Sequence, residues 1–383
     1  MINLCHLTPT PFLNESRVKK QVYSMSKDKN ILKIYVLALN KKNLPKFETI
    51  SDKASLHRIT LLSRFLPRLI FFQTIKYFEL IIRIIFFVIK NKVKFIVIHS
   101  LSLLPIGWLL KIFFNAKIIY DCHELETEAF GLKGFRKKIS KLTEKFFIRY
   151  VDLVVVVSKG IHNWYEKEYN LKKIITVRNT PLKKLGNKSN YFREKYKISS
   201  ENTIILYLGG LFKGRSINQL ISIFEEINAS NLFLVFMGYG EMEEFIKQKS
   251  KNNKNIFLHK AVETNQILEI ASSADIGIAY LNNGSLNDNL CLPNKFFEYI
   301  FSGLPVITSN SPDMVDIINK YNIGITISKL NKENLLKAIN KIKNLNHNIL
   351  KESLFSAAID LNWDSEEVIL LNGYKSLINK KVK

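Results

Sequence analysis

The stretch "CLPNKFFEYIFSGLPVITSN", residues 291–310, holds the unit from which the fold is built, a helix followed by a short buried strand. Pro293 suits the first turn of a helix, because that turn leaves its N–H groups unbonded, and Gly303 suits the C-terminal cap. The strand "PVITS" follows directly. We therefore expect a helix of about three turns beside one strand of a parallel sheet.

The same alternation of apolar strands and helical stretches runs in both directions from this unit. The expected strands are "KIYVLAL", "KFIVIHS", "AKIIYDCHE" and "VDLVVVVS", then "TIILYLGG", "LFLVFMGYG", "NIFLH", "ADIGIAYL" and "LPVITS". Such alternation is typical of parallel sheets covered by helices, and 383 residues are too many for one ordinary core. We predict an α/β protein with two doubly wound, Rossmann-like domains, 1–185 and 195–362. A C-terminal helix, 363–383, is expected to pack back on the first domain.

The composition indicates an anionic partner. A formal net charge of +24 would suit a nucleic acid, a lipid surface or a phosphorylated small molecule. The sequence has no helix-turn-helix, zinc or RNP-like signature, so we expect no nucleic acid. The start of the chain lacks the pattern of a signal peptide, and three widely spaced cysteines fit reduced thiols in a cytoplasm.

Residues 65–95, "FLPRLIFFQTIKYFELIIRIIFFVIKNKVKF", resemble a membrane span in composition. Charged side chains interrupt the segment at Arg68, Lys76, Glu79, Arg83 and Lys90. No apolar run approaches the roughly 20 residues that a bilayer requires, so the segment does not span. It is either a basic, aromatic surface helix in an anionic membrane interface or a domain helix with its core face inward.

The stretch "YLGGLFKGRSINQL", residues 207–220, leads from a strand through glycines into a helix. Ligands of doubly wound sheets lie at the carboxyl ends of strands, where helix N-terminal amides attract phosphate. Lys213 and Arg215 add positive charge there. The spacing from Gly209 to Gly214 nearly reproduces a P-loop, but arginine replaces its lysine and no later strand ends in the aspartate needed for magnesium. An ordinary turn with surface cations is the other alternative.

Polar residues also follow the strands of the first half. Asp121 and His123 point the same way at the end of one strand. His99 and Ser158 end two further strands of the same rim. A metal site would need more ligands at recognisable spacing, so we expect a hydrogen-bonding pair and no metal.

The helix of the opening stretch has two faces. Its apolar face consists of Phe297, Ile300 and Phe301, and its polar stripe of Asn294, Lys295, Glu298 and Ser302. Lys295 and Glu298 could form a surface ion pair of small energy. Alternatively, the stripe borders a cleft in which Glu298 accepts two hydroxyl protons of a sugar.

These motifs together carry a resemblance to a known family. "YLGGLFKGR", "FMGYGEMEEF", "SADIGIAYL" and "LPNKFFEYIFSGLPVITSN" resemble the C-terminal domain of GT-B glycosyltransferases of family 4, a retaining group with many bacterial polysaccharide enzymes. "YDCHELE" and "VVVVSKGI" are similar to its N-terminal half. The resemblance implies two domains facing each other across a cleft. The second would hold a nucleotide-sugar donor and the first an acceptor, without metal or cofactor.

The resemblance assigns roles to particular residues. Glu298 matches the second glutamate of the family's E-x7-E motif, Arg215 the cation on the donor diphosphate, and His123 the cleft histidine. The other implied donor-binding residues are Gly209, Gly210, Lys213, Gly238, Asn289, Leu290, Pro293, Asn294 and Lys295. The implied cleft rim is Arg17, His99, Asp121 and Ser158. Two positions depart from the family, with Leu290 at the first motif glutamate and Gly210 at a second diphosphate cation, and "PFLNESRVKK" replaces its glycine-rich first loop.

The expected function is transfer of a sugar, with retention, to a glycan or lipid-linked acceptor in cell-surface polysaccharide synthesis. The cations of residues 133–141 suggest peripheral attachment to an anionic membrane, at the inner face of the plasma membrane. A non-catalytic GT-B partner subunit and a sugar-nucleotide epimerase are the alternatives.

Overall fold

The computed structural model describes residues 1–13, 15–182, 186–227, 229–282 and 284–378. The chain forms two compact units. Unit 1 is Met1–Val177 with Glu367–Lys383, and unit 2 is Arg178–Glu366. Residue 185, at which the sequence analysis ends the first domain, lies outside the described residues, as do residues 379–383 of the predicted C-terminal helix.

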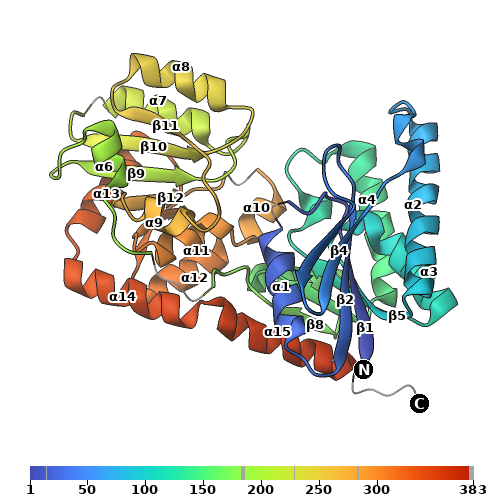
Figure 1. The fold of residues 1–383 in the computed structure, drawn as a ribbon. Coiled ribbons are helices and arrows are strands. Elements are labelled where there is room, and N and C mark those ends of the chain that lie inside the picture. The colour runs from blue at the N-terminus through green and yellow to red at the C-terminus, as the bar shows by residue number, and fades with distance from the viewer. Residues whose placement is uncertain (14, 183–185, 228, 283, 379–383) are drawn as a thin grey trace. The chain divides into compact units, whose positions relative to one another are not determined.

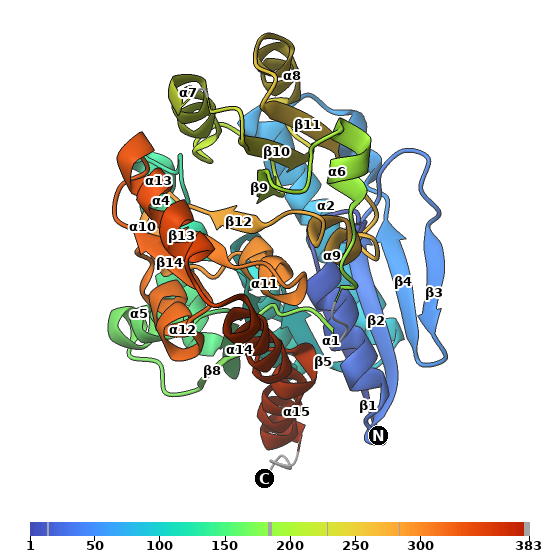
Figure 2. The ribbon, with the colours of Figure 1, turned by 90° about the vertical axis from the view of Figure 1, so that its left-hand side faces the viewer.

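Unit 1 is built on an eight-stranded sheet in the order β3-β4-β2-β1-β5-β6-β7-β8 (Figure 1). The strands are β1 (Ile2–Leu7), β2 (Ile31–Leu39), β3 (Phe47–Ser51), β4 (Ala54–Ile59), β5 (Val93–Ile98), β6 (Lys117–Cys122), β7 (Leu153–Val156) and β8 (Ile174–Thr176). Only β3, the edge strand at the right of Figure 2, pairs in the antiparallel sense. The sequence analysis names no strand at β1, yet β1 lies between β2 and β5 inside the sheet.

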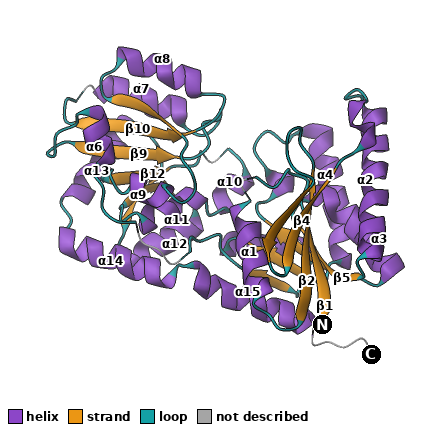
Figure 3. Cartoon of the chain, in the orientation of Figure 1, coloured by secondary structure: helices purple, strands orange, loops and turns teal. Residues whose placement is uncertain are grey.

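Helices cover both faces of this sheet. They are α1 (Ser16–Ser26), α2 (Ile70–Lys90), α3 (Leu104–Phe114), α4 (Gly134–Phe147), α5 (Lys159–Tyr169) and most of α15 (Trp363–Ile378), with short 3-10 turns η1 (Leu62–Phe65), η2 (Leu101–Leu103), η3 (Glu126–Glu128) and η4 (Ile148–Tyr150). Figures 1 and 3 show α1 and α15 on one face, and α2, α3 and α4 on the other. The contact with α15 is close, because a Cβ at Gly373 would lie 2.5 Å from the Ile175 side chain.

Unit 2 has a six-stranded, wholly parallel sheet in the order β11-β10-β9-β12-β13-β14. The strands are β9 (Thr203–Leu208), β10 (Leu232–Gly238), β11 (Ile256–Lys260), β12 (Ile276–Ala279), β13 (Val306–Ser309) and β14 (Gly324–Ile327). The helices are α6 (Tyr191–Tyr196), α7 (Ile217–Ile227), α8 (Glu243–Asn252), α9 (Ile267–Ala271), α10 (Leu286–Leu290), α11 (Asn294–Phe301), α12 (Pro312–Tyr321), α13 (Lys332–Lys343) and α14 (His347–Asp360). Two buried hydrophobic clusters flank the sheet. The predicted fold class, two α/β domains with parallel sheets, is thus confirmed.

In the opening stretch α11 ends before Gly303 at φ 71° and leads into β13, as predicted. The helix has 8 residues, which is little more than two turns instead of three, because Pro293 is extended and serves as its N-cap. Tyr299 on α11 has a role that the sequence did not indicate. Its hydroxyl accepts a hydrogen bond from the Leu208 amide at 2.8 Å and donates to the Leu206 carbonyl at 2.9 Å. The tyrosine therefore anchors the carboxyl end of β9, the strand from which the glycine loop departs.

The segment predicted at 65–95 contains α2, a domain helix whose Leu80, Ile84 and Val88 are buried. Its opposite side is also apolar, and there Phe78, Ile82 and Phe86 are 64 to 68% exposed. In the part of the chain that is described, no helix is both long enough and apolar enough to cross a membrane. The domain-helix interpretation is thus confirmed for the buried face, and the membrane-interface interpretation stays a prediction for the exposed one.

Candidate functional site

In unit 2, the loop between β9 and α7 requires glycine for two different reasons. Gly209 and Gly214 have φ values of 113° and 81°, a region that favours glycine. Gly238 at the end of β10 is held by close approach instead, because a Cβ there would lie 1.8 Å from the Gly209 carbonyl oxygen. The shape of the loop therefore depends on backbone angles and backbone contacts that only glycine allows.

This loop borders a cavity of about 240 Å³ at the beginning of α7. Lys213, Gly214 and Ser216 are among its lining residues. Ser216 is 5% exposed, and its hydroxyl has no hydrogen-bond partner among the described residues. A buried hydroxyl without a partner costs free energy, so a ligand oxygen at this helix N-terminus would satisfy it. The Lys213 amide, by contrast, already donates to the Glu241 carboxylate at 3.0 Å.

Lys295 is buried, whereas the predicted polar stripe would leave it at the surface. Its Nζ sits 3.7 Å from the ring centroid of Tyr207 in β9. Burial lowers the pKa of Lys295 to about 7, with the Arg215 guanidinium acting in the same direction. The charge of Glu298 acts in the opposite direction and raises the pKa of Lys295. Because Lys295 is buried, any pairing of the two residues is not the surface ion pair considered from the sequence. A buried amine whose positive charge is only partly balanced is suited to an anionic ligand.

The other residues predicted on this side lie on and around α10 and α11. Glu298 is half-buried on α11, and Asn294, exposed at its beginning, accepts a hydrogen bond from Asn179 at 2.8 Å. The Asn289 carbonyl accepts from the Ser311 hydroxyl at 2.6 Å. Leu290, which replaces the first motif glutamate, ends α10. Arg215 is exposed, and among the described residues no carboxylate lies within ion-pair distance of its guanidinium.

In unit 1, the predicted rim is organised around the fully buried carboxylate of Asp121. Arg17 on α1 donates to it from Nη2 at 2.6 Å and from Nε at 3.1 and 3.0 Å, and Gln21 donates at 2.7 Å. Burial alone would raise the pKa of Asp121, but the charge of Arg17 and the contacts with His123 hold it well below its usual range. Arg17 and Asp121 thus form a buried support rather than an exposed rim.

Three histidines form a row of consecutive contacts that begins at the Asp121 carboxylate. His123 Nε2 lies 3.0 Å and His99 Nδ1 3.1 Å from Asp121 Oδ2, which confirms the predicted pair at the end of β6. His99 Nε2 is 2.8 Å from Nδ1 of His6, and the two rings are stacked. Burial lowers the pKa of both His6 and His99. His123, 31% exposed, is the member of the row that a substrate can reach.

His6 is a residue that the sequence analysis missed. It is on β1, the strand that was also missed, and its Nε2 has no partner among the described residues. The run "INLCHL" with its alternating pattern was the available signal. Ser158, by contrast, was placed on the rim but is buried, and its hydroxyl caps α5 by accepting from the Ile161 amide.

The ligand atoms of His99, Asp121 and His123 lie within 4.8 Å of one another, close enough to surround a metal ion. The chemistry of the donor set argues against that use. The Arg17 guanidinium, 2.6 Å from the same carboxylate, already supplies the positive charge that a cation would bring.

Comparisons with known proteins agree with this geometry. The sequence model of the family Glycosyl transferases group 1 matches residues 189–358, which lie within unit 2. Chitobiosyldiphosphodolichol beta-mannosyltransferase of Candida albicans is 24% identical over 261 residues, which are 60% of this chain and 55% of that protein. The match therefore spans a little more than half of the relative's length.

Solved structures show the likeness of the fold. Sucrose-phosphate synthase from Thermosynechococcus elongatus superimposes with a TM-score of 0.80 at 14% identity, covering 99% of both chains. Anabaena HepE in complex with UDP-glucose gives 0.74 at 11% identity, covering 98% of this chain and 100% of that one. Residues 189–358 thus belong to the glycosyl transferases of group 1, and the protein has the GT-B-like fold that the resemblance predicts.

The histidine row makes a prediction about stability. We expect the free energy of unfolding to decrease as the pH falls below about 6.5, because His6 and His99 are neutral when folded and take up protons on unfolding. Their contribution is intact above the unfolded pKa and is lost in acid. Each imidazole adds a slope of about 1.4 kcal/mol per pH unit in that range. Urea unfolding between pH 7 and 5 measures it.

Two variants isolate the effect. His99→Gln should flatten the pH dependence by about one proton, whereas His347→Gln, at an exposed position on α14, should leave it unchanged. An unchanged slope in the His99 variant would show that the buried row does not control acid stability.

Proposed function

We propose that the protein is a metal-independent, retaining glycosyltransferase that moves a hexose from a nucleoside diphosphate sugar to a glycan or lipid-linked acceptor. The observation that carries the proposal is the edge of unit 2, within the segment that the family model matches. There a glycine loop, a helix N-terminus, the cations Arg215 and Lys295 and the carboxylate of Glu298 lie on neighbouring elements. The complex of HepE with UDP-glucose supports a nucleotide-sugar donor.

The chemistry follows from the charge that develops on the leaving group. Breaking the bond from the anomeric carbon to the diphosphate places negative charge on the departing phosphate. Arg215, Lys295 and the amides at the beginning of α7 are positioned to stabilise that charge without a metal ion. Since Gly210 stands where the family has a second cation, we assign that cation's place to Lys295. Retention would follow from attack on the same face, with the leaving phosphate accepting the acceptor proton.

We assign the acceptor to unit 1, with His123 as its candidate catalytic residue. The buried contacts of Asp121 hold the His123 ring in place through its Nε2. Its other ring nitrogen, Nδ1, would then contact a sugar hydroxyl. The Candida relative is named for an acceptor that is a diphosphate lipid, which supports a lipid-linked acceptor here.

We further propose that the protein works at an anionic membrane surface in the synthesis of a cell-surface polysaccharide. The exposed apolar stripe of α2 consists of Phe71, Ile75, Phe78, Ile82, Phe86 and Ile89. A second such row on α4 consists of Phe135, Ile139, Leu142 and Phe146. Apolar rows flanked by lysine and arginine are typical of helices that lie in a membrane interface.

Removing the carboxylate of Glu298 tests the donor site. Glu298→Ala should weaken binding of the donor by about 2 to 3 kcal/mol, because two charge-assisted hydrogen bonds to ribose hydroxyls are lost. A thermal-shift screen of nucleotide sugars identifies the donor, and calorimetry measures its affinity. Glu263→Ala, at an exposed position of unit 2, is the matched control. Unchanged donor affinity in a folded Glu298 variant would remove this residue from the site.

Arg215 is expected to act mainly in the transition state. Arg215→Ala should lower kcat by a larger factor than it lowers donor affinity, because the charge on the leaving phosphate grows as the bond breaks. Arg215→Lys should recover part of the rate. Steady-state kinetics together with donor titration separate the two effects. An equal loss in kcat and in affinity would instead assign Arg215 to ground-state binding.

Attachment to a membrane is tested by co-sedimentation with vesicles. The protein should bind anionic but not neutral vesicles, and salt should weaken the binding. Lys137 and Lys141 are each 2.5 Å from the Glu128 carboxylate, so the cations of residues 133–141 that stay available are Lys133, Arg136 and Lys138. Each contributes about 1 kcal/mol near an anionic surface.

Changing these three cations to glutamate should abolish sedimentation. The control carries the same change of charge at Lys29, Lys172 and Lys173, which are exposed elsewhere on unit 1. A protein that stays in the supernatant with anionic vesicles at low salt would indicate a soluble acceptor.

A further inference from the structure

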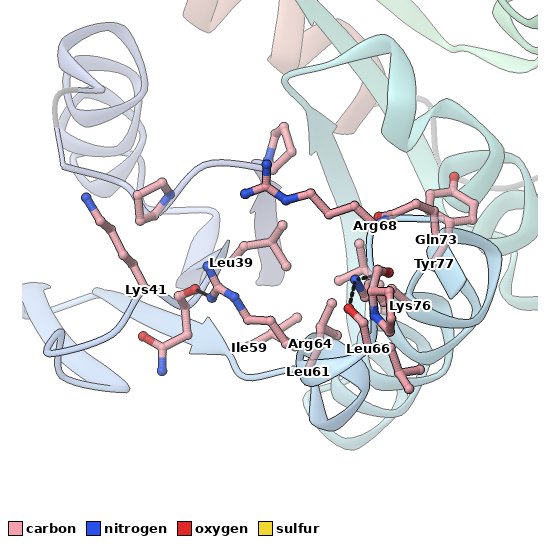
Figure 4. A pocket seen from close by; sticks show the side chains of 15 residues that line it. Leu39, Lys41, Ile59, Leu61, Arg64, Leu66, Arg68, Gln73, Lys76 and Tyr77 are labelled. Atoms are coloured by element: carbon pink, nitrogen blue, oxygen red, sulfur yellow. Dashed lines mark hydrogen bonds between the residues drawn. The ribbon is translucent and has the colours of Figure 1, made fainter. Parts of the chain in front are cut away.

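Unit 1 contains a cavity of about 800 Å³. Its lining does not include His6, His99 or His123. It lies at the carboxyl ends of β1, β2 and β4, where these strands meet η1 and the first turns of α2. Figure 4 shows its lining side chains, with Lys41 and Arg68 extending from opposite sides. Ligands of parallel sheets bind at this end of the strands, so the cavity is in the right place for a substrate group.

The lining of the cavity combines apolar walls with uncompensated positive charge. Its walls include Leu39, Ile59, Leu61, Leu66 and Leu80. Four cations, Lys41, Arg64, Arg68 and Lys76, complete the lining, and none of the fifteen residues is acidic. Among the described residues, none of the four is in an ion pair. Four cations around one cavity repel each other unless an anion enters.

Two of these cations shape the cavity. Lys76 Nζ donates to the carbonyl oxygens of Leu66 at 2.8 Å and Pro67 at 3.2 Å, which holds the segment that carries Arg68. Arg64 donates to the Asn40 carbonyl. Within the described part of the chain Lys41 and Arg68 make no such contact, and both are exposed. They are the two whose charge a ligand would meet first.

The acid nearest in sequence is already engaged. Glu79 on α2 accepts hydrogen bonds from the amides of Leu62 and Ser63 at 2.7 and 2.8 Å, and from Arg83 at 2.7 Å. Burial alone would raise the pKa of Glu79, but these hydrogen bonds and that of the Ser63 hydroxyl lower it to about 2. Its charge therefore fixes η1 against α2 and leaves the cations of the cavity for another anion.

The apolar stripe of α2 defined above starts at the same end of the helix. Gln73, Lys76, Tyr77 and Leu80 line the cavity, while Phe71, Ile75 and Phe78 are exposed on the neighbouring side of the same turns. A ligand with an anionic group in the cavity and an attached apolar chain could thus lay that chain on the exposed stripe of α2, directly beside the cavity.

We propose that this cavity binds the phosphate or diphosphate group of the lipid acceptor, with the lipid chain running along the exposed stripe of α2. The inference rests on the proposed transfer to a lipid-linked acceptor and adds the place where the acceptor's charged group is held. β1 and β5 separate β2 from β6 in the sheet, so β2, the middle one of the three strands at the cavity, lies about 14 Å from the strand that leads to His123. That separation fits an acceptor with a glycan between its phosphate and its reacting hydroxyl.

Calorimetry with farnesyl diphosphate as the probe tests the proposal without donor or activity. We expect saturable binding that weakens at least about ten-fold in the double variant Lys41→Ala/Arg68→Ala, because two charge-assisted contacts are lost. Inorganic pyrophosphate should bind less tightly than farnesyl diphosphate, and farnesol should not bind at the cavity. The matched control is Lys29→Ala/Lys172→Ala, which removes two exposed charges from the same unit.

Further measurements distinguish binding in this cavity from binding at the donor site and from adsorption to bulk lipid. Arg215→Ala should leave binding of farnesyl diphosphate unchanged, because that residue belongs to the donor site in unit 2. A double variant that keeps its affinity for farnesyl diphosphate but no longer sediments with phosphatidylglycerol vesicles would overturn the assignment and make the cavity a site for bulk lipid. Equal binding by the double variant and its control in both assays would also overturn it. Either failure leaves the Glu298 test of the donor site unaffected.

Discussion

The carboxyl edge of unit 1 depends on one buried charge, the carboxylate of Asp121. An ionised carboxylate with no exposed surface is stable only when its oxygens are fully hydrogen-bonded and its charge is balanced. Arg17 and Gln21 on α1 meet this requirement from one side, and His99 and His123 from the other. Arg17 also donates to the Val177 carbonyl, the last residue of the first part of unit 1. The contacts that hold His123 are thus continuous with contacts that hold the fold of unit 1.

The corresponding constraint in unit 2 is steric. β10 approaches the glycine loop so closely that no side chain fits at Gly238. Tyr299 on α11 holds β9, the strand before that loop, through hydrogen bonds to its backbone. A rigid loop leaves the amides at the beginning of α7 in fixed positions, as an electrostatic site for a diphosphate requires. The two units therefore reach the same end, preorganised polar groups at strand ends, by different physical means.

The sequence predicted what depends on local patterns and missed what depends on distant contacts. Periodicity and caps placed α11 and its neighbours, and the ends of β5 and β6 placed His99, Asp121 and His123. β1 was missed because its first residues are only half-buried and its short run follows directly from the chain terminus. The burial of Lys295 over Tyr207 could not be predicted, since 88 positions separate the two residues and only the fold joins them. Ser158 and Arg17 were placed near the right edge, but their burial was not visible in the pattern.

The positions of the cations in the structure bear on why the protein has an excess of positive charge. A lysine-rich protein could owe a net charge of +24 to composition alone, and then its cations would be scattered and its acids paired at random. In unit 1 the acids near the cavity and near α4 are engaged locally, Glu79 by η1 and Arg83, and Glu128 by Lys137 and Lys141. What remains uncompensated lies beside exposed apolar rows on α2 and α4. Cations next to exposed phenylalanine and isoleucine are poorly explained by solubility, and a negatively charged amphiphile accounts for both features at once.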